Sequence, residues 1–166
     1  MKTKILFLIV IILTITACRK YPEGGSYFLN SIDNEIIGTY NFTHYYIDGK
    51  DSVNYYFNPD GKLELGYYKQ HIMHPLYLTN YFYDNNNYGV RGEWRWNNKN
   101  KKELNFKILY TYLITDSSYI NVDSIFVAGP FTYDIESIWD IKKIKNNELI
   151  IETDYNNKHY RAELKK

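Results

Sequence analysis

The chain has 166 residues, with 20 Lys and Arg side chains against 19 Asp and Glu, and a single cysteine. This length fits one domain with its own core, and the near-zero net charge gives no basis for nucleic-acid binding. One thiol excludes a disulfide within the chain and a thiolate metal cluster.

The first eighteen residues have the order of a secretory signal. Lys2 and Lys4 precede an apolar run, Ile5 to Ile15, and small residues then lead to Cys18. A run of about 11 residues is shorter than the ~20 that a membrane-spanning helix needs. The ending Ile15-Thr16-Ala17-Cys18 resembles the lipobox of bacterial lipoproteins, which implies cleavage after residue 17 and lipidation of Cys18. Plain secretion and an uncleaved anchor are the alternatives.

The sequence divides into three regions: a signal peptide (1–17), a lipidated cysteine with a flexible tether (18–34) and a folded domain (35–166). Pro22, Gly24 and Gly25 break local structure in the second region and favour a flexible linker. Two or three acyl chains hold a protein stably on a membrane. The membrane is therefore the first expected partner.

In the first half of the domain, apolar and polar residues alternate with the period of a β-strand. The first strand would place Gly38, Tyr40, Phe42, His44 and Tyr46 on one face and end at Asp48-Gly49. Later strands are expected over about 52–57, 63–67 and 76–83. Between the second and third of these four strands, Asn58-Pro59-Asp60-Gly61 predicts a hairpin turn.

In the second half, Trp94 and Trp96 share one face of a strand over 90–96, and a polar turn follows at 97–102. Strict alternation then predicts a strand over 104–112 that carries Tyr110 and Tyr112 on its apolar face. Residues 113–135 show no clear pattern. The chain ends in a predicted meander over 137–144, 148–154 and 158–164, and no segment has a sustained helical period.

Eight to ten short antiparallel strands joined by tight turns predict an all-β fold. The arrangement favours a small up-and-down β-barrel of the lipocalin-like kind, with a β-sandwich as the alternative. The high aromatic content, 18% with 19 Tyr, agrees with a β-rich domain. A membrane-spanning barrel would also alternate, but the lipobox already supplies attachment.

Several segments together resemble the lipocalin-like lipoproteins of Bacteroidota. They are Gly38-Thr39-Tyr40, Tyr56 to Lys62, Gly92-Glu93-Trp94, and Trp139 to Ile144 followed by Asn147-Glu148-Leu149. The resemblance covers residues 35–166 and implies a small lipid-anchored β-barrel of the cell envelope. In lipoproteins of this kind, export to the cell surface tends to follow acidic residues just after the cysteine. Arg19 and Lys20 stand there instead, which favours the periplasmic face of the outer membrane, with surface exposure as the alternative.

Aromatic side chains are the best candidates for ligand binding. If their face lines a hollow barrel, they would hold a small apolar molecule. If they lie outside, they would stack on sugar rings or a partner protein. Packing of a solid core is the alternative. The candidates are Tyr40, Tyr46, Trp94, Trp96, Tyr110 and Tyr112.

Metal-site and modification motifs are weak. His71-x-x-His74 lacks an acidic partner and precedes a proline, so exposed loop histidines are expected. The run Asp84 to Gly89 departs from a calcium loop and favours a turn. Asp51-Ser52-Val53 and Asp123-Ser124-Ile125 resemble the O-glycosylation motif of exported Bacteroidota proteins.

Catalytic motifs are missing from the sequence. There is no Gly-x-Ser-x-Gly elbow, and paired carboxylates could come only from scattered residues: Glu64, Glu93, Asp123 and Glu136. We therefore expect a non-enzymatic envelope protein without metal or cofactor that binds a small apolar ligand. A glycan- or protein-interaction module is the second hypothesis, and a hydrolase is the third.

Overall fold

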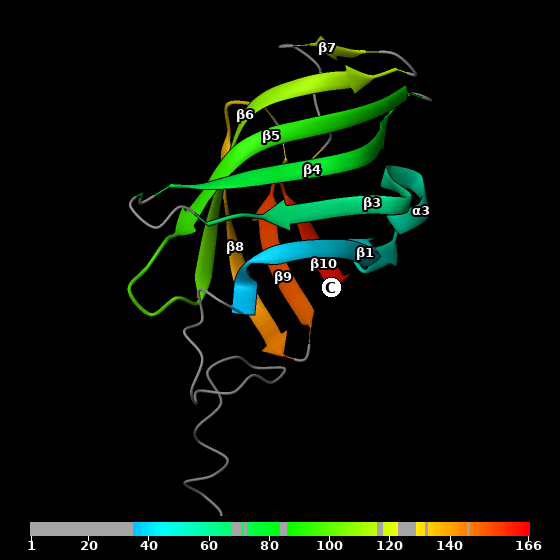
Figure 1. The fold of residues 1–166 in the computed structure, drawn as a ribbon. Coiled ribbons are helices and arrows are strands. Elements are labelled where there is room, and N and C mark those ends of the chain that lie inside the picture. Colours follow the sequence, from blue (N-terminus) through cyan, green and yellow to red (C-terminus); the bar gives the residue numbers. More distant parts are fainter. Residues whose placement is uncertain are drawn as a thin grey trace, which may run out of the picture.

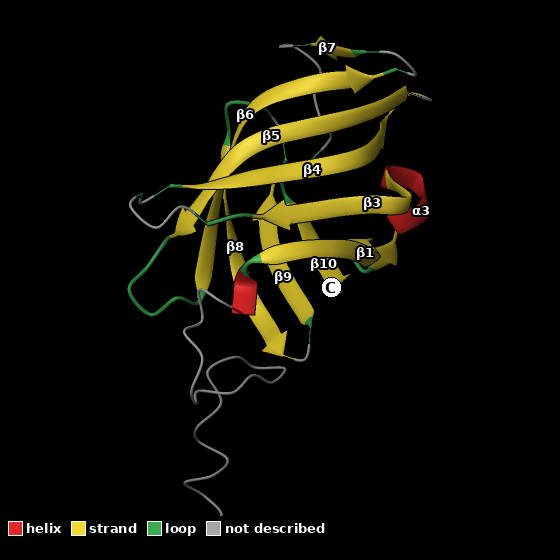
Figure 2. Ribbon diagram, viewed as in Figure 1, coloured by secondary structure: helices red, strands yellow, loops and turns green. Residues whose placement is uncertain are grey.

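The computed structural model describes residues 35–67, 71, 73–83, 86–115, 118–122, 129–131, 133–145 and 147–166. These residues are nearly all β-structure (Figures 1 and 2), with a four-residue helix, α3 (Val53–Tyr56). The strands are β1 (Gly38–Ile47), β2 (Lys50–Asp51), β3 (Phe57–Leu65), β4 (His74–Tyr83), β5 (Asn86–Trp96), β6 (Glu103–Ile114), β7 (Tyr119–Asn121), β8 (Glu136–Lys145), β9 (Glu148–Tyr155) and β10 (Lys158–Lys165). The predicted signal peptide and tether, with Cys18, lie outside the described residues.

Eight strands form a closed antiparallel barrel with up-and-down connectivity. The order is β1-β3-β4-β5-β6-β8-β9-β10, and β10 pairs back with β1 from Asn41↔Lys165 to Ile47↔Tyr160. The short strands β2 and β7 pair with β1 and β6 outside this ring. The predicted barrel is confirmed and the sandwich is wrong, because pairing of the first and last strands leaves no free sheet edge.

The predicted strand between residues 52 and 57 is wrong, and so is the hairpin at 58–61. Residues 53–56 form α3 because the Asp51 carboxylate accepts the Val53 N–H at 3.1 Å and starts a helical turn. Residues 58–61 lie inside β3, where the register opposite β4 is irregular between Phe57 and Lys62. The turn residues therefore produce a bulge rather than a chain reversal.

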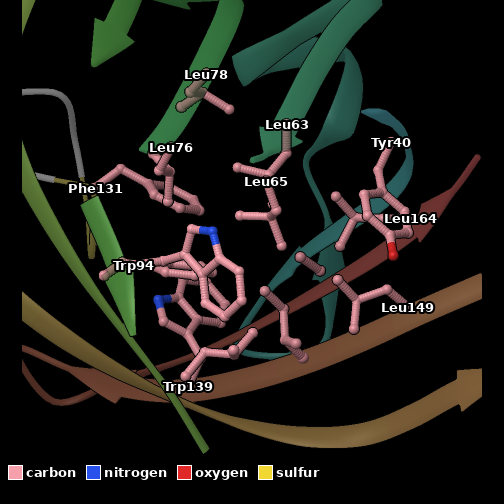
Figure 3. Close-up of a cluster of buried hydrophobic side chains, with 14 of the residues drawn as sticks. Tyr40, Leu63, Leu65, Leu76, Leu78, Trp94, Phe131, Trp139, Leu149 and Leu164 are labelled. Atoms are coloured by element: carbon pink, nitrogen blue, oxygen red, sulfur yellow. The ribbon is translucent and has the colours of Figure 1, made fainter. Parts of the chain in front are cut away.

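The barrel has an apolar interior and a charged exterior. Inward leucines of β3 and β4 lie in one buried cluster with Leu149 of β9 and Leu164 of β10 (Figure 3). On the outside, Arg161 donates to Glu152 at 2.6 Å and to Glu163 at 2.9 Å. The core is thus inside the ring of strands, as the closed topology requires.

We call the two ends of the barrel the base and the rim. The base holds residues 35–39, the 97–102 turn, the β8–β9 connection around Asn147 and residues 165–166. The rim holds the β1–β2 turn at 48–49, α3 and the β9–β10 turn. At the base, the buried Tyr40 hydroxyl donates to the carbonyl oxygens of Glu35 and Ile36, each 3.0 Å away. Burial and the Glu35 charge raise the pKa of this hydroxyl well above its usual range, so it remains a donor.

Candidate functional site

The predicted ligand-binding aromatics do not lie on one face. Tyr40 and Trp94 are inside the barrel with at most 1% of their surface exposed, whereas Tyr110 is 51% exposed. Trp96 is half-buried and meets Trp94 edge to face, with ring centroids 5.8 Å apart. Two β-bulges, one in β1 and one in β6, explain why some of these side chains point inward and others outward.

The first bulge reverses the alternation of β1. Phe42 pairs with Leu164 and His44 pairs with Glu163, which leaves Thr43 as an extra residue whose hydroxyl donates to the Glu163 carbonyl at 2.9 Å. Beyond it, Tyr45 is buried while His44 and Tyr46 stack on each other outside, with centroids 5.6 Å apart. The prediction that Tyr40 and Tyr46 share a face is wrong for this reason.

The second bulge does the same in β6. Gly92 pairs with Ile108 and Arg91 pairs with Tyr110, so Leu109 is the extra residue. Thr111 is consequently buried, while Tyr110 points outward and Tyr112 covers Gly89 of the neighbouring strand. The predicted common face of residues 104–112 is therefore correct only as far as Ile108.

Phe131, in the connection from β7 to β8, fills part of the interior beside Trp139. Phe131 is completely buried and stacks on the Trp139 indole with centroids 5.2 Å apart and an interplanar angle of 25° (Figure 3). Phe106 packs against both rings at 6.2–6.3 Å. The sequence assigned no role to this segment. Together with Trp94, these rings are among the largest fully buried side chains of the described residues.

A pocket of about 590 Å³ lies at the rim, between β1 and α3. This volume is within the usual range for small-molecule sites. Ile47, Val53, Tyr55 and Tyr56 supply apolar and aromatic surface. The polar side chains around them are Lys50, Asp51, Ser52 and Asn54. The lining is thus mixed, with aromatic rings on one part and hydrogen-bonding groups on another.

Asp51 fixes the shape of this pocket. One carboxylate oxygen accepts the N–H groups of Val53 at 3.1 Å and Tyr45 at 3.3 Å, and the other lies 2.7 Å from the His44 ring nitrogen. Burial raises the pKa of the Asp51 carboxyl, but these hydrogen bonds outweigh burial and the pKa is lowered. The carboxylate stays ionised near neutral pH and ties α3 to β1.

Aromatic contacts extend the pocket into the barrel wall. Tyr55, with 72% of its surface exposed, meets Tyr56 edge to face at 4.8 Å, and Tyr56 meets the buried Tyr45 at 5.9 Å. Tyr45 in turn contacts Phe57 at 5.1 Å. The rim therefore presents a continuous row of rings from solvent to core, at residues that the sequence interpretation did not select.

The two candidate histidines are separated by the fold. His71 is exposed, but His74 begins β4, is 8% exposed and has its ring between Tyr67 and Trp94, at 4.7 and 4.8 Å. The expectation of exposed loop histidines is thus wrong for His74. In the part of the chain that the structure describes, no group of three His, Cys, Asp or Glu side chains is arranged to hold a metal ion.

The scattered carboxylates do not form a described pair. Glu64 lies on β3 and Glu93 on β5, with β4 between them. Hydrogen bonds from Asn105 and Arg95 hold Glu136, and together with nearby positive charge they lower its carboxyl pKa. Asp123 lies outside the described residues, as do Ser124 and Ile125. Ser52 of the other O-glycosylation-like motif donates to the Lys50 carbonyl at 3.2 Å.

Of the run proposed as a turn, Asp84 and Asn85 lie outside the described residues, while Asn86 to Gly89 belong to β5. Among the described residues, no helix combines the length and the apolarity that crossing a membrane requires.

The fold and the pocket together define an eight-stranded up-and-down barrel with a packed aromatic interior and a binding-sized pocket at its rim. No family model, no curated protein and no solved structure matches this chain.

Proposed function

We propose that this protein is a non-enzymatic, lipid-anchored barrel of the cell envelope that binds a small amphipathic molecule at its rim. The carrying observation is the pocket of about 590 Å³ beside α3. Tyr55, Tyr56 and Val53 offer an apolar surface, and Lys50 and Asn54 offer hydrogen bonds at the edge. A ligand with an apolar face and polar substituents matches both parts.

The rim is a better site than the interior for a physical reason. Trp94, Trp139, Phe106 and Phe131 are each fully buried and contact other protein rings. A ligand in that region would have to displace stacked aromatic side chains from a close-packed core. The rim pocket is already formed and requires no such displacement.

The anchor part of the proposal depends on the lipobox. Alkyne-palmitate labelling in a bacterial host should mark the full chain but not the Cys18→Ala variant. Equal labelling of both would refute lipidation at Cys18.

The binding part is tested by mass spectrometry of the molecules that copurify with the native lipoprotein. We expect an organic molecule that is lost from Tyr55→Ala, because this ring lines the pocket. Since 72% of its surface is exposed, we also expect the variant to fold. Tyr110→Ala removes an exposed tyrosine that does not line the pocket and is the matched control. Retention of the molecule by Tyr55→Ala, or its loss from both variants, would refute the rim as the site.

Glycan recognition is the second candidate function. An exposed ring at Tyr55, with Ser52 and Asn54 in the same lining, offers the stacking surface and the hydrogen bonds that a sugar requires. Titration with a panel of neutral oligosaccharides, compared with single-chain detergents, separates this candidate from the first. Binding of the sugars alone would favour it.

A further inference from the structure

Cations and carboxylates are unequally distributed between the two ends of the barrel. Several residues of the base are Lys or Arg, although the whole chain is close to neutral. Around residues 35–39, 64–66, 95–103, 143–148 and 165–166, the described cations are Arg95, Lys99, Lys101, Lys102, Lys143, Lys145, Lys165 and Lys166. The carboxylates of the same segments are Glu35, Glu64, Glu103 and Glu148. Two more lie against these segments: Asp140 is opposite Glu103, and Glu136 forms an ion pair with Arg95. The rim has the opposite balance, with Asp48, Asp51 and Asp154 against Lys50 and Lys158.

Some of the basal cations are already engaged. Lys143 forms an ion pair with Glu148, and the Lys166 amine donates to the Glu35 carbonyl at 2.7 Å while lying over the Tyr40 ring. Others point into solvent from the turns and strand ends. The exposed lysines of this group are Lys99, Lys102, Lys145 and Lys165. They form the outermost part of the base and belong to three separate chain segments.

The basal end is also where the domain joins the tether. Residues 35–38 lead into β1 at the lower side of the barrel in Figure 1, where β8 also ends. Sixteen residues separate Cys18 from Glu35, and a chain of that length reaches at most about 55 Å when fully extended. A lipid on Cys18 would therefore keep this end of the barrel within reach of the membrane surface.

We propose that the basal lysines bind the anionic headgroups of the membrane that holds the anchor, so that the rim pocket faces away from the bilayer. This inference rests on the proposed lipid anchor. Attraction between lysines and an anionic surface decays within about 8 Å at physiological salt. Only the turn lysines can come that close while the barrel stands upright, and the acidic rim is repelled by the same surface.

The test uses the lipidated full chain on vesicles of phosphatidylcholine, with and without phosphatidylglycerol. A fluorophore is placed at Asn100→Cys in the basal turn or at Asn156→Cys in the rim turn, because lipidation leaves no other free thiol. Quenchers on the lipid headgroups report proximity. We expect quenching at position 100 to exceed that at position 156 several-fold on anionic vesicles, and to fall when salt is raised.

Matched variants assign the effect to the basal lysines. Lys99→Gln combined with Lys102→Gln should reduce quenching at position 100 to its level on neutral vesicles. Lys107→Gln combined with Lys158→Gln removes the same charge elsewhere and should leave it unchanged. Equal quenching at the two positions, equal quenching on both kinds of vesicle, or equal effects of the two variants would overturn the inference.

Failure of the anchor gives a different result. If the chain carries no lipid, it should not bind neutral vesicles in a flotation assay. That result would refute the anchor. On anionic vesicles that chain, with Cys18→Ser so that position 100 carries the only thiol, should still bind with position 100 as the quenched site. Its failure to do so would refute the basal lysines as a membrane-binding surface.

Discussion

At the scale of single residues, Asp51 connects β1 and α3 around the rim pocket. Its carboxylate holds two backbone N–H groups and the His44 ring, and these contacts lower its pKa below the ordinary value of 3.8. A lowered carboxyl pKa contributes stability above the unfolded-state pKa, and this contribution is lost as the pH falls through the folded-state pKa. The contacts of Asp51 at the rim should therefore stabilise the protein less in acid.

The Asp51→Asn variant tests this dependence. At neutral pH the wild type should unfold at a higher denaturant concentration than the variant. Below pH 3.8 the difference should shrink, because protonation removes the charge that the variant already lacks. Denaturant unfolding followed by tyrosine fluorescence between pH 7 and pH 2 measures it. Parallel curves across that range would show that the carboxylate charge does not stabilise the rim.

At the scale of elements, the close pairing of β5 and β6 depends on a glycine. A Cβ atom at Gly92 would lie 2.2 Å from the Lys107 carbonyl oxygen, so the two strands approach more closely than any side chain allows. Gly92→Ala should lower the free energy of unfolding by about 1–3 kcal/mol or more. Gly49→Ala is the control, since its φ of +79° strains alanine by about 1–2 kcal/mol while nothing lies within 4 Å.

Urea unfolding of both glycine variants measures the difference. A clash with backbone cannot be relieved by rotating a side chain, so Gly92→Ala should be the less stable of the two. If Gly49→Ala proved equally damaging, the close approach of β5 and β6 would not be the reason for glycine at position 92.

The β7–β8 connection supplies a second test at this scale. Phe131→Ala removes a completely buried ring from the stack on Trp139 and should cost about 3–5 kcal/mol. The variant should also gain binding of an apolar dye, because the space left is lined by aromatic carbon. Tyr133→Ala, at 38% exposed in the same segment, should cost much less. A small loss of stability in Phe131→Ala would mean that this connection does not fill the barrel.

At the scale of the whole molecule, the sequence predicts the barrel but not the pocket. Alternation and turn residues locate the last three strands to within about two residues of their ends, as for Glu148–Tyr155. Alternation alone does not reveal the extra residues Thr43 and Leu109, since a bulge depends on the pairing of two strands. Tyr46 and Tyr110 therefore appeared to face inward.

The site was harder to predict than the fold because it comes from local exceptions to the pattern. The Ser52 to Phe57 segment has the composition of a strand, whereas the Asp51 carboxylate accepts the Val53 N–H and favours the helical turn of α3. Burial of Phe131 depends on where the β7–β8 connection lies against Trp139, which no periodicity encodes. The near-zero net charge likewise conceals the separation of charge between base and rim.

The most direct test of this account is a nuclear magnetic resonance titration of the ¹⁵N-labelled protein, stripped of its copurifying molecule, with the fraction released from native material. Trp94 and Trp139 report on the interior through indole N–H groups that bond to the Gly66 carbonyl at 2.9 Å and to the Ser137 hydroxyl at 3.0 Å. The account predicts that backbone amides of residues 50–56 shift while both indole signals stay in place. Shifts of the indole signals with unchanged amides over 50–56 would place the ligand inside the barrel and contradict it.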